Sequence, residues 1–264
     1  MGRLIHLSDI HFGCENKAAV AAAADCAHAG KFDLTAITGD VTQYGHEAEF
    51  DAARDWIEAL PGPVLLTPGN HDTPWAGMID RVFKPFGRYE RRFGPAWSGV
   101  HQGPEVAARA FNTARGIQVR LNWSKGAAAP EHAQAVADGL GAAPQGALRV
   151  ALCHHPLMEV VGGPMTAKVR GGVRAARILA EGGVDLVLSG HVHIPFAVPL
   201  PCEDGKSYAV GAGTLSIRER GMPPGFNIVE WDADSVNVTA QGWTGSKFEP
   251  LRTWTLARRK SAAA

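Results

Sequence analysis

The sequence predicts an α/β (α+β) fold, and two observations carry this prediction. Short apolar runs with strand character alternate with helical patterns from residue 3 to residue 67, which is the order of repeated β-α-β units. The same alternation resumes between residues 148 and 189. Strands that alternate with helices in this way are typical of a parallel sheet covered by helices.

The N-terminal third contains the clearest elements. Strands are expected at residues 3–8, 34–38 and 64–67, because each is an apolar run that polar residues or glycine bring to an end. A helix is expected at 16–30, where alanine gives high helix propensity and Gly30 closes the run. A second helix is expected at 47–60, before the helix-stopping Pro61-Gly62-Pro63.

The remaining elements are less regular. Between Trp75 and Gly146 only two strands are expected, at 107–112 and 117–122, and the aromatic residues from Trp75 to Trp97 are expected to pack in the core. A strand at 148–153, a basic helix at 167–182 and a strand at 185–189 follow. After His193, runs at 207–211, 226–231 and 236–240 are expected to form a second sheet. We expect one domain over residues 1–257 and a frayed tail over 258–264.

Composition narrows the class of protein. The chain has 264 residues, 45% of them hydrophobic and 20% charged, with a formal net charge of +0, so nothing indicates a stable nucleic-acid partner. Its four cysteines (Cys14, Cys26, Cys153 and Cys202) lack Cys-x-x-Cys spacing, which favours free thiols in a reducing compartment. A strand begins almost at Met1, and no apolar run is long enough to cross a membrane. We therefore expect a cytoplasmic protein without a transmembrane segment, and a homodimer stays open.

Five short clusters of metal-binding side chains occur along the chain, each at the C-terminal end of an apolar run. They are Asp9-Ile10-His11, Gly39-Asp40, Gly69-Asn70-His71-Asp72, His154-His155 and Gly190-His191-Val192-His193. Open α/β sheets place their sites at the carboxyl ends of strands, so these side chains are expected to meet. An Asp-x-His pair alone is a weak signal, but five clusters in these positions favour a metal site over unrelated surface or core histidines.

The ligand types indicate which metals fit. Neutral imidazole, carboxylate and amide oxygen suit two divalent ions such as Mn²⁺, Fe²⁺/Fe³⁺ or Zn²⁺. Asp9 and His11 are two residues apart, as are His191 and His193, so an extended chain would point both members of each pair the same way. Asp40, on a tight glycine turn, is expected to bridge two ions by offering one oxygen to each.

The five clusters, in this order, resemble the pattern of the calcineurin-like metallophosphoesterase superfamily: Asp-x-His, Gly-Asp, Gly-Asn-His-(Asp/Glu), His and Gly-His-x-His. The resemblance covers roughly residues 3–231. It implies a four-layer α/β/β/α sandwich, in which two mixed sheets are flanked by helices and a dinuclear site lies at the sheet ends.

Carried over cluster by cluster, the resemblance implies the following ligand sets: Asp9, His11, Asp40 and His193 for the first metal, and Asp40, Asn70, His154 and His191 for the second. Either histidine of the His154-His155 pair can be the ligand; His154 is preferred because it follows its strand directly.

A catalytic role is expected for two further residues. His71 follows the Asn70 ligand and is expected to donate a hydrogen bond or proton toward the leaving oxygen, while a metal-bridging hydroxide attacks phosphorus. Asp72 is expected either to orient His71 or simply to cap the turn.

The substrate class follows from one departure from a family pattern. Protein Ser/Thr phosphatases of this superfamily carry Asp-Arg-Gly after the second cluster, but here Asp40 is followed by Val41-Thr42-Gln43. The chain is more similar to bacterial class III cyclic nucleotide phosphodiesterases and glycerophosphodiesterases, which share the Leu-Ser-Asp-x-His opening and a His-His-Pro block. A small phosphodiester, such as a cyclic nucleotide, is therefore the expected substrate.

Residues that contact the substrate are less clear from sequence. Phe12, Trp75 and Phe196 follow ligand loops and either stack on a substrate or pack the loops. Arg218 and Arg220 either bind phosphate as paired donors or are solvated surface charges. The basic residues of the 167–182 helix, Lys168, Arg170, Arg174 and Arg177, are expected to form only a polar helix face.

Three rival functions remain. One is a pyrophosphatase of a nucleotide-lipid, of the UDP-diacylglucosamine type, for which the aromatic residues from Trp75 to Trp97 would supply an apolar surface. A DNA nuclease is disfavoured by the neutral net charge. A non-catalytic scaffold with the same fold is disfavoured because every ligand position holds a suitable residue.

Overall fold

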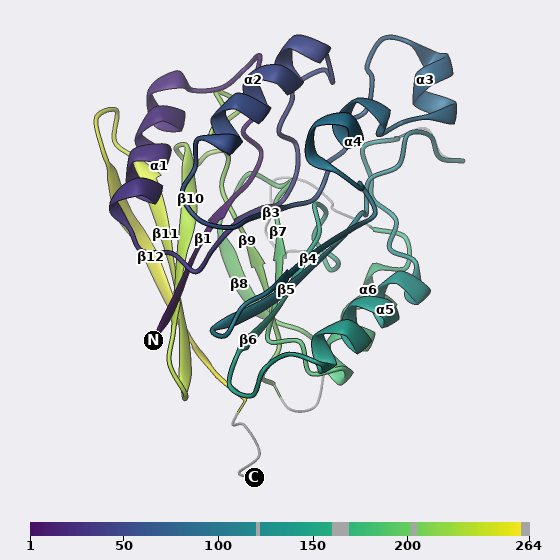
Figure 1. The fold of residues 1–264 in the computed structure, drawn as a ribbon. Helices are drawn as coiled ribbons and strands as arrows, with labels where there is room; N and C mark the ends of the chain where they lie inside the picture. Colours follow the sequence, from purple (N-terminus) through teal and green to yellow (C-terminus); the bar gives the residue numbers. More distant parts are fainter. Residues whose placement is uncertain (120–121, 160–168, 202–204, 260–264) are drawn as a thin grey trace.

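Two six-stranded mixed sheets pack face to face and are flanked by helices (Figure 1). The computed structural model describes residues 1–119, 122–159, 169–201 and 205–259. The strand order is β12-β11-β10-β1-β2-β3 in the first sheet and β4-β5-β6-β7-β9-β8 in the second. The expected four-layer sandwich of two mixed sheets and flanking helices is confirmed.

The first sheet combines both ends of the chain. Its parallel part comprises β1 (Gly2–Leu7), β2 (Leu34–Ile37) and β3 (Val64–Leu66). Antiparallel to β1 runs β10 (Gly225–Trp231), followed by β11 (Ser235–Trp243) and β12 (Phe248–Ala257). The parallel strands all end at the edge that carries the first three metal-binding clusters.

The second sheet has a parallel centre and antiparallel edges. The parallel strands are β5 (Val106–Phe111), β6 (Leu148–Leu152), β7 (Leu186–Ser189) and β9 (Tyr208–Gly211). The edge strands β4 (Ser98–Gln102) and β8 (Phe196–Pro199) pair antiparallel with β5 and β9. The remaining two metal-binding clusters follow β6 and β7.

Three apolar cores separate the four layers. Leu4, Leu34, Val150, Leu188 and Val229 belong to the core between the sheets. The outer face of the first sheet packs against α1 (Lys17–Ala29), α2 (Glu47–Glu58) and α4 (Gly87–Phe93). The outer face of the second packs against α5 (Pro130–Gly141) and α6 (Gly172–Glu181).

Local sequence explains how the helices begin and end. The side chain of Asn16 accepts the backbone N–H of Ala19 and caps α1, and Gly30 donates its N–H to Cys26 at the other end. Pro130 opens α5 at a position where a missing N–H costs nothing. Gly171 precedes α6 with a positive φ of 79°, and this helix begins at Gly172; residues 167 and 168 of the expected helix lie outside the described residues.

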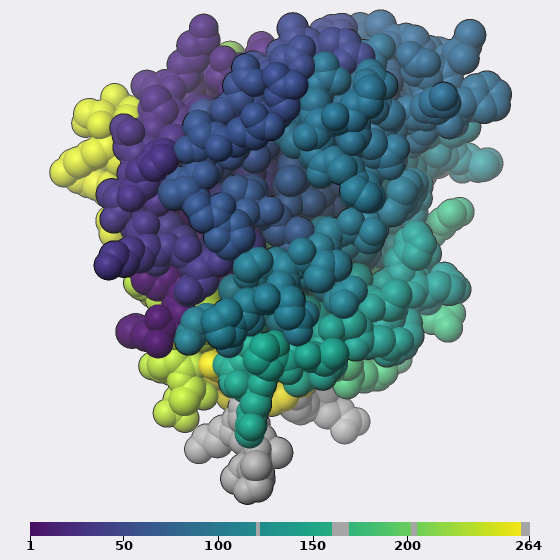
Figure 2. Space-filling model, in the orientation of Figure 1, coloured from purple at the N-terminus to yellow at the C-terminus, as the bar shows by residue number. Residues whose placement is uncertain are grey.

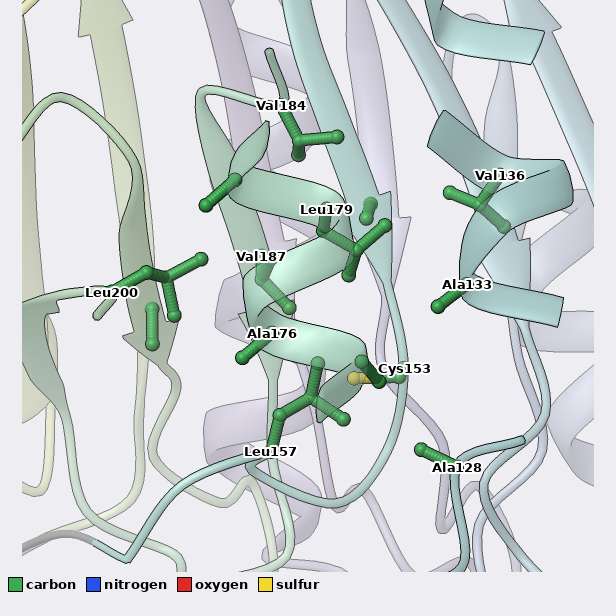
Figure 3. Close-up of a cluster of buried hydrophobic side chains, with 14 of the residues drawn as sticks. Ala128, Ala133, Val136, Cys153, Leu157, Ala176, Leu179, Val184, Val187 and Leu200 are labelled. Carbon is green, nitrogen blue, oxygen red and sulfur yellow. The ribbon is translucent and has the colours of Figure 1, made fainter. Parts of the chain in front are cut away.

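Cys153 belongs to the core of the second sheet's outer face. It follows β6 and packs with Leu157, with Ala176 and Leu179 of α6 and with Val187 of β7 (Figure 3). Burial raises the pKa of its thiol, so it is an inert apolar side chain. Cys14, Cys26 and Cys153 are free, and Cys202 lies outside the described residues.

Several sequence predictions of elements were wrong. The C-terminal runs do not make a separate second sheet: β9 joins the second sheet beside β7, whereas β10 and β11 extend the first sheet beside β1. The expected strand at 117–122 is absent from its described residues, and β4, β8, β12, α3 (Met78–Phe83) and α4 were not expected. Arg258, in the expected frayed tail, donates to the carbonyls of Asp232 and Gly146.

Among the described residues, no helix is long and apolar enough to cross a membrane.

The segment from Trp75 to Trp97 divides into an exposed and a buried part. Phe86 and Tyr89 are buried beneath α2 and α4, whose joint surface is visible in Figure 2. Arg92 of α4 contacts both Glu47 and Asp51 of α2. Trp75, Ile79 and Phe83, in contrast, are 70%, 76% and 78% exposed. The expected core packing is therefore right for α4 and wrong for α3, which protrudes from the body of the molecule (Figure 1).

A buried asparagine connects the two sheets beneath the strand ends, and a buried histidine of the first sheet contacts it. Asn227 of β10 donates its side-chain N–H to Gly211 O of β9 and lies 3.3 Å from His6 Nδ1 on β1. His6 Nε2 lies 3.0 Å from Thr38 Oγ1. Because an amide nitrogen can only donate, this arrangement fits a neutral His6 whose Nε2–H faces Thr38. Burial lowers the pKa of His6 from 6.5 to about 3.

This lowered pKa predicts a loss of stability in acid. The unfolded chain takes up a proton at His6 as the pH falls through 6.5, but the folded chain does not until about pH 3. Between these limits the free energy of unfolding falls by up to about 1.4 kcal/mol per pH unit on account of this residue. We expect His6→Gln to show a shallower decline from pH 6.5 to pH 4.5 in urea unfolding of the metal-free protein. Equal slopes for the variant and the wild type would contradict this account.

Candidate metal centre

All five predicted clusters meet where the parallel strands of the two sheets end. The loops are joined by backbone hydrogen bonds: Asp9 N donates to Gly39 O, His11 N to Asp40 O, and Gly190 N to His154 O. The first two connect the loops after β1 and β2, and the third connects those after β6 and β7. The five clusters therefore converge, as their positions at the strand ends predicted.

The backbone at the centre differs from the expected extended chain. In the part of the chain that the structure describes, five non-glycine residues have a positive φ: Asp9, His11, Asp40, His191 and His193, with values from 50° to 67°. All five are predicted ligands. This left-handed conformation costs roughly 1–3 kcal/mol per residue and is a feature of functional sites. The side chains of Asp9 and His11 do converge, but through these turns and not through strand alternation.

Glycine at three motif positions lets the loops approach each other closely. Gly39 has φ +85°, and a Cβ there would meet the backbone of Gly69. A Cβ at Gly69 would overlap Asp40, and one at Gly190 would overlap Ser8 Oγ and Asp9 Oδ2. The glycine that precedes each of Asp40, Asn70 and His191 is therefore required by packing.

Asp9, His11 and His193 form the first group of ligand atoms. Asp9 Oδ1 lies 3.1 Å from His193 Nε2 and 3.8 Å from His11 Nε2, and the two imidazole nitrogens are 3.4 Å apart. The other oxygen of Asp9 accepts hydrogen bonds from Ser8 Oγ at 2.6 Å and from the N–H of His191 at 2.9 Å. Asp9 is thus oriented by one oxygen and presents the other to the histidines.

Asp40 lies between this first group and a second group, which contains His154 and His191. Its Oδ2 is 3.9 Å from His11 Nε2 and 3.3 Å from His154 Nε2, while its Oδ1 accepts the N–H of His71 at 2.7 Å. A single oxygen therefore faces both groups, in contrast to the expected division of one oxygen to each side.

Unsatisfied polar atoms test whether the centre fits a metal. Asp9 Oδ1, Asn70 Oδ1, His154 Nε2 and His191 Nε2, together with His11 Nδ1, are buried without a hydrogen-bond partner. Buried polar atoms normally have partners, because leaving one unpaired costs about 1–3 kcal/mol. Four sets of three carboxylate oxygens or imidazole nitrogens lie within 4.8 Å of one another here. The residues therefore fit bound cations, which would satisfy the atoms that face the centre; His11 Nδ1 is not among them, because His11 faces the centre with Nε2.

The ring nitrogens distinguish the two adjacent histidines. His154 has Nδ1 at 2.7 Å from Thr38 O, which leaves Nε2 facing Asp40. His155 has both nitrogens engaged, Nδ1 at 2.9 Å from Thr113 Oγ1 and Nε2 at 2.8 Å from Ser124 O. An Nδ1–H held by a backbone carbonyl is the usual support of a metal-binding histidine. This pattern belongs to His154.

Asp72 contacts backbone and not the His71 ring. Its carboxylate accepts the N–H groups of Gly69 and Thr42 and the Thr42 hydroxyl, at 2.8, 2.9 and 2.8 Å. Burial, with the nearby charge of Asp40, raises the pKa of Asp72 to about 7. Its geometry corresponds to the turn-capping alternative.

His71 lies at the half-buried rim of the centre. Its Nδ1 is 2.7 Å from Gln43 O, its Nε2 is 3.0 Å from Arg218 Nη1, and its ring meets His11 edge-on. The ring is therefore oriented by Gln43 and Arg218, neither of which the sequence could assign to it.

Charge at the centre is concentrated on two buried carboxylates. Burial opposes ionisation of Asp9 and Asp40, but the adjacent imidazoles, His193 for Asp9 and His154 for Asp40, hold both pKa values below the usual range. The pKa of His154 is lowered by burial but, on balance, raised by Asp40 to about 9. Burial lowers the pKa of His11 and His191 to about 3, so these imidazoles are neutral, as ligation requires.

Supporting residues were missing from the sequence prediction. Ser8 and Thr38 hold Asp9 and His154, and the Thr214 hydroxyl donates to Asp9 O at 2.6 Å. The only signal in the sequence is that Ser8 and Thr38 adjoin ligand clusters, and Thr214 has none. In the part of the chain that the structure describes, Arg170, Arg174 and Arg177 form no hydrogen bond or ion pair with the candidate ligands, and Lys168 lies outside the described residues.

The aromatic candidates have different surroundings. Phe12 and Phe196 are buried at 8% and 6% exposure and pack the loops, while Trp75 is exposed and contacts Tyr44 edge-on. Arg218 reaches His71, and burial lowers the pKa of Arg220 although Asp9 and Asp40 act against this. Both arginines thus lie near the centre.

Residues 2–195 match the family described as calcineurin-like phosphoesterase. The chain belongs to this family. A probable cyclic nucleotide phosphodiesterase from Synechococcus is 28% identical over 166 residues, which is 62% of this chain and 59% of the relative. The matched region therefore spans less than two thirds of that relative's length.

Solved structures support the phosphoesterase fold. Purple acid phosphatase from yellow lupin seeds is similar over 97% of this chain and 54% of its own, with a TM-score of 0.71 and 13% identity. A dimetal phosphatase from Danio rerio is similar over 98% of this chain and 99% of its own, with a TM-score of 0.66 and 11% identity. At such identities the likeness concerns the fold alone.

The packing at Gly190 leads to a prediction about metal affinity. A methyl group there would displace Ser8 and Asp9, so Gly190→Ala is expected to weaken Mn²⁺ binding about 10- to 100-fold, as loss of a metal site's support does. Calorimetric titration of chelator-treated protein with Mn²⁺ measures this. Gly141→Ala, at the end of α5 with open space around it, is the matched control and should bind as wild type. Equal affinity of both variants would contradict this account.

Proposed function

We propose that this phosphoesterase hydrolyses small phosphodiesters with two divalent cations. The observation that carries the proposal is Asp40, whose Oδ2 faces His11 on one side and His154 on the other, among buried ligand atoms without protein partners. A carboxylate in this position is what a pair of cations about 3.5–4 Å apart requires.

The proposed ligand sets are those that the family resemblance implies, and the grouping of carboxylate oxygens and imidazole nitrogens at the centre supports them. The first cation would be held by Asp9, His11, Asp40 and His193, and the second by Asp40, Asn70, His154 and His191. Mn²⁺, iron and Zn²⁺ all suit these ligands. His154 is proposed in place of His155 because both ring nitrogens of His155 already have partners.

When bound, two such cations lower the pKa of water and offset the negative charge that grows on phosphorus. The chain's own residues shape the surroundings of this chemistry. Asp72 holds the loops after β2 and β3 together through Thr42 and Gly69, which sets the place of Asn70 and His71. His71 is positioned at the half-buried rim of the centre by Gln43.

A diester substrate is proposed on two grounds. The loop after Asp40 reads Val41-Thr42-Gln43, without an arginine to pair with the second charge of a monoester dianion. The partial likeness to a probable cyclic nucleotide phosphodiesterase points in the same direction. We also propose that the protein is located in a reducing compartment, the cytoplasm, because Cys14, Cys26 and Cys153 are free thiols.

The proposal predicts metal-dependent turnover of a diester. Protein stripped by a chelator and refilled with Mn²⁺ should hydrolyse bis-p-nitrophenyl phosphate faster than p-nitrophenyl phosphate, as measured by release of p-nitrophenol. Asp40→Asn should lose activity at least about 100-fold, because both ligand groups lose the charge that faces them. Asp234→Asn, on the distant β10–β11 turn, is the matched control and should retain activity.

Other outcomes of this assay are informative. Preference for the monoester would overturn the substrate class and leave the metal centre in place. Turnover of neither compound with two metals bound would favour the nucleotide-lipid pyrophosphatase. One observation supports that second candidate: Trp75, Ile79 and Phe83 expose apolar surface a few residues beyond His71.

The histidine pair gives a separate prediction. His154→Ala should bind only one equivalent of Mn²⁺ tightly, since it removes the Nε2 that faces Asp40. His155→Ala should keep two equivalents but melt several degrees lower, because Thr113 and Ser124 lose their buried partner. Elemental analysis after gel filtration and thermal melting distinguish the two. The reverse pattern would make His155 the ligand.

A further inference from the structure

Arg218 is anchored to the metal centre by its own backbone. It lies in the loop that follows β9, where its N–H donates to Ser216 Oγ at 3.2 Å. Its carbonyl oxygen is 2.8 Å from His193 Nδ1, so it receives the N–H that sets the orientation of this proposed ligand. The position of Arg218 is thus tied to that of the first ligand group.

The side chain of Arg218 crosses to the opposite loop. Its Nη1 is 3.2 Å from Gln43 Oε1 and 3.0 Å from His71 Nε2. Both partners are neutral acceptors, and among the described residues no carboxylate forms an ion pair with Arg218. A half-buried guanidinium has five N–H donors, and Nη1 alone makes both of these contacts. The charge and the remaining donors stay available to an anion.

The contact also defines the protonation of His71. A guanidinium cannot accept a hydrogen bond, so His71 Nε2 must be the acceptor. The Nδ1 then carries the proton and donates it to Gln43 O. In this arrangement His71 has no Nε2 proton to give to a leaving group. It therefore does not fit the role expected from the sequence, which was to donate a hydrogen bond or proton toward the leaving oxygen.

We propose that Arg218 is the phosphate-binding cation of this site, and that His71 and Gln43 are positioning residues that hold it. Arg218 would present, from the loop after β9, the free edge of its guanidinium to a non-bridging oxygen of the phosphoryl group. One guanidinium matches the single negative charge of a phosphodiester. This inference rests on the proposed function, because it assumes a phosphoryl substrate.

Arg218→Lys tests the proposal, since it keeps the charge and removes the planar fork. Binding of inorganic phosphate to the Mn²⁺-loaded protein should weaken about 10- to 100-fold, and KM for bis-p-nitrophenyl phosphate should rise by a similar factor. The Mn²⁺ content should not change, because the carbonyl that holds His193 is backbone. Arg252→Lys, whose side chain lies over Trp254 on β12, is the matched control. Unchanged phosphate binding in Arg218→Lys would overturn the proposal.

The role of His71 is tested by its coupling to Arg218. His71→Gln should raise KM, and the double variant with Arg218→Lys should be no worse than the more affected single variant, since both act on one guanidinium. Additive effects would mean that His71 acts independently and would overturn its positioning role.

The tautomer of His71 gives a readout without metal or activity. In the ¹⁵N spectrum of metal-free protein at pH 8, with His71→Gln used to identify the signal, Nε2 should be the unprotonated nitrogen. A protonated Nε2 would overturn the proposed contact. If the wild type turned over no phosphodiester, the proposed function would fail, yet this spectrum and phosphate binding would still decide the role of Arg218.

Discussion

The centre depends on one interaction between the sheets, the approach of Asp40 to His154. Asp40 follows β2 of the first sheet and His154 follows β6 of the second, and their side chains meet at 3.3 Å. The same imidazole is held from the first sheet by Thr38 O. Because the core between the sheets is filled by apolar side chains such as Leu34, Val150 and Leu188, the distance between the strand ends is set by packing. The ligand geometry is therefore a consequence of how two sheets stack.

The left-handed turns are the second constraint, and the loops around them offset their cost. Asp9 and His11, which have these left-handed turns, donate their backbone N–H groups to carbonyl oxygens of the loop after β2. Between the same two loops, Phe12 N donates to Val41 O and Gln43 N donates to Phe12 O. These bonds continue the pairing of β1 and β2 past the strand ends. Strain stored at a site persists only where neighbouring structure determines the conformation. Here the hydrogen bonds that hold the left-handed turns in place come from the loops themselves and involve no bound ligand.

Much of the fold and the centre could be predicted from local sequence. The helix over Lys17–Ala29 and the strand ends at Leu7, Ile37 and Leu66 follow from alanine content, glycine and apolar runs. The partner of a strand cannot be predicted in this way: β10 has the pattern of any half-buried strand, and only long-range packing places it beside β1. Exposed β12, with Pro250 and Arg252 in it, lacks the apolar alternation that marks a strand.

The same distinction applies within the centre. Residue types at the strand ends were enough to name the candidate ligands, because the ability to bind a metal is a property of each side chain alone. The proton on His71 is a property of three loops together, since Gln43 accepts at Nδ1 and Arg218 donates at Nε2. A histidine beside a ligand asparagine suggests an acid, but a guanidinium on its far nitrogen makes it an acceptor. The role of such a residue therefore has to be read from its partners, and here the partner carries the charge that a phosphoryl group needs.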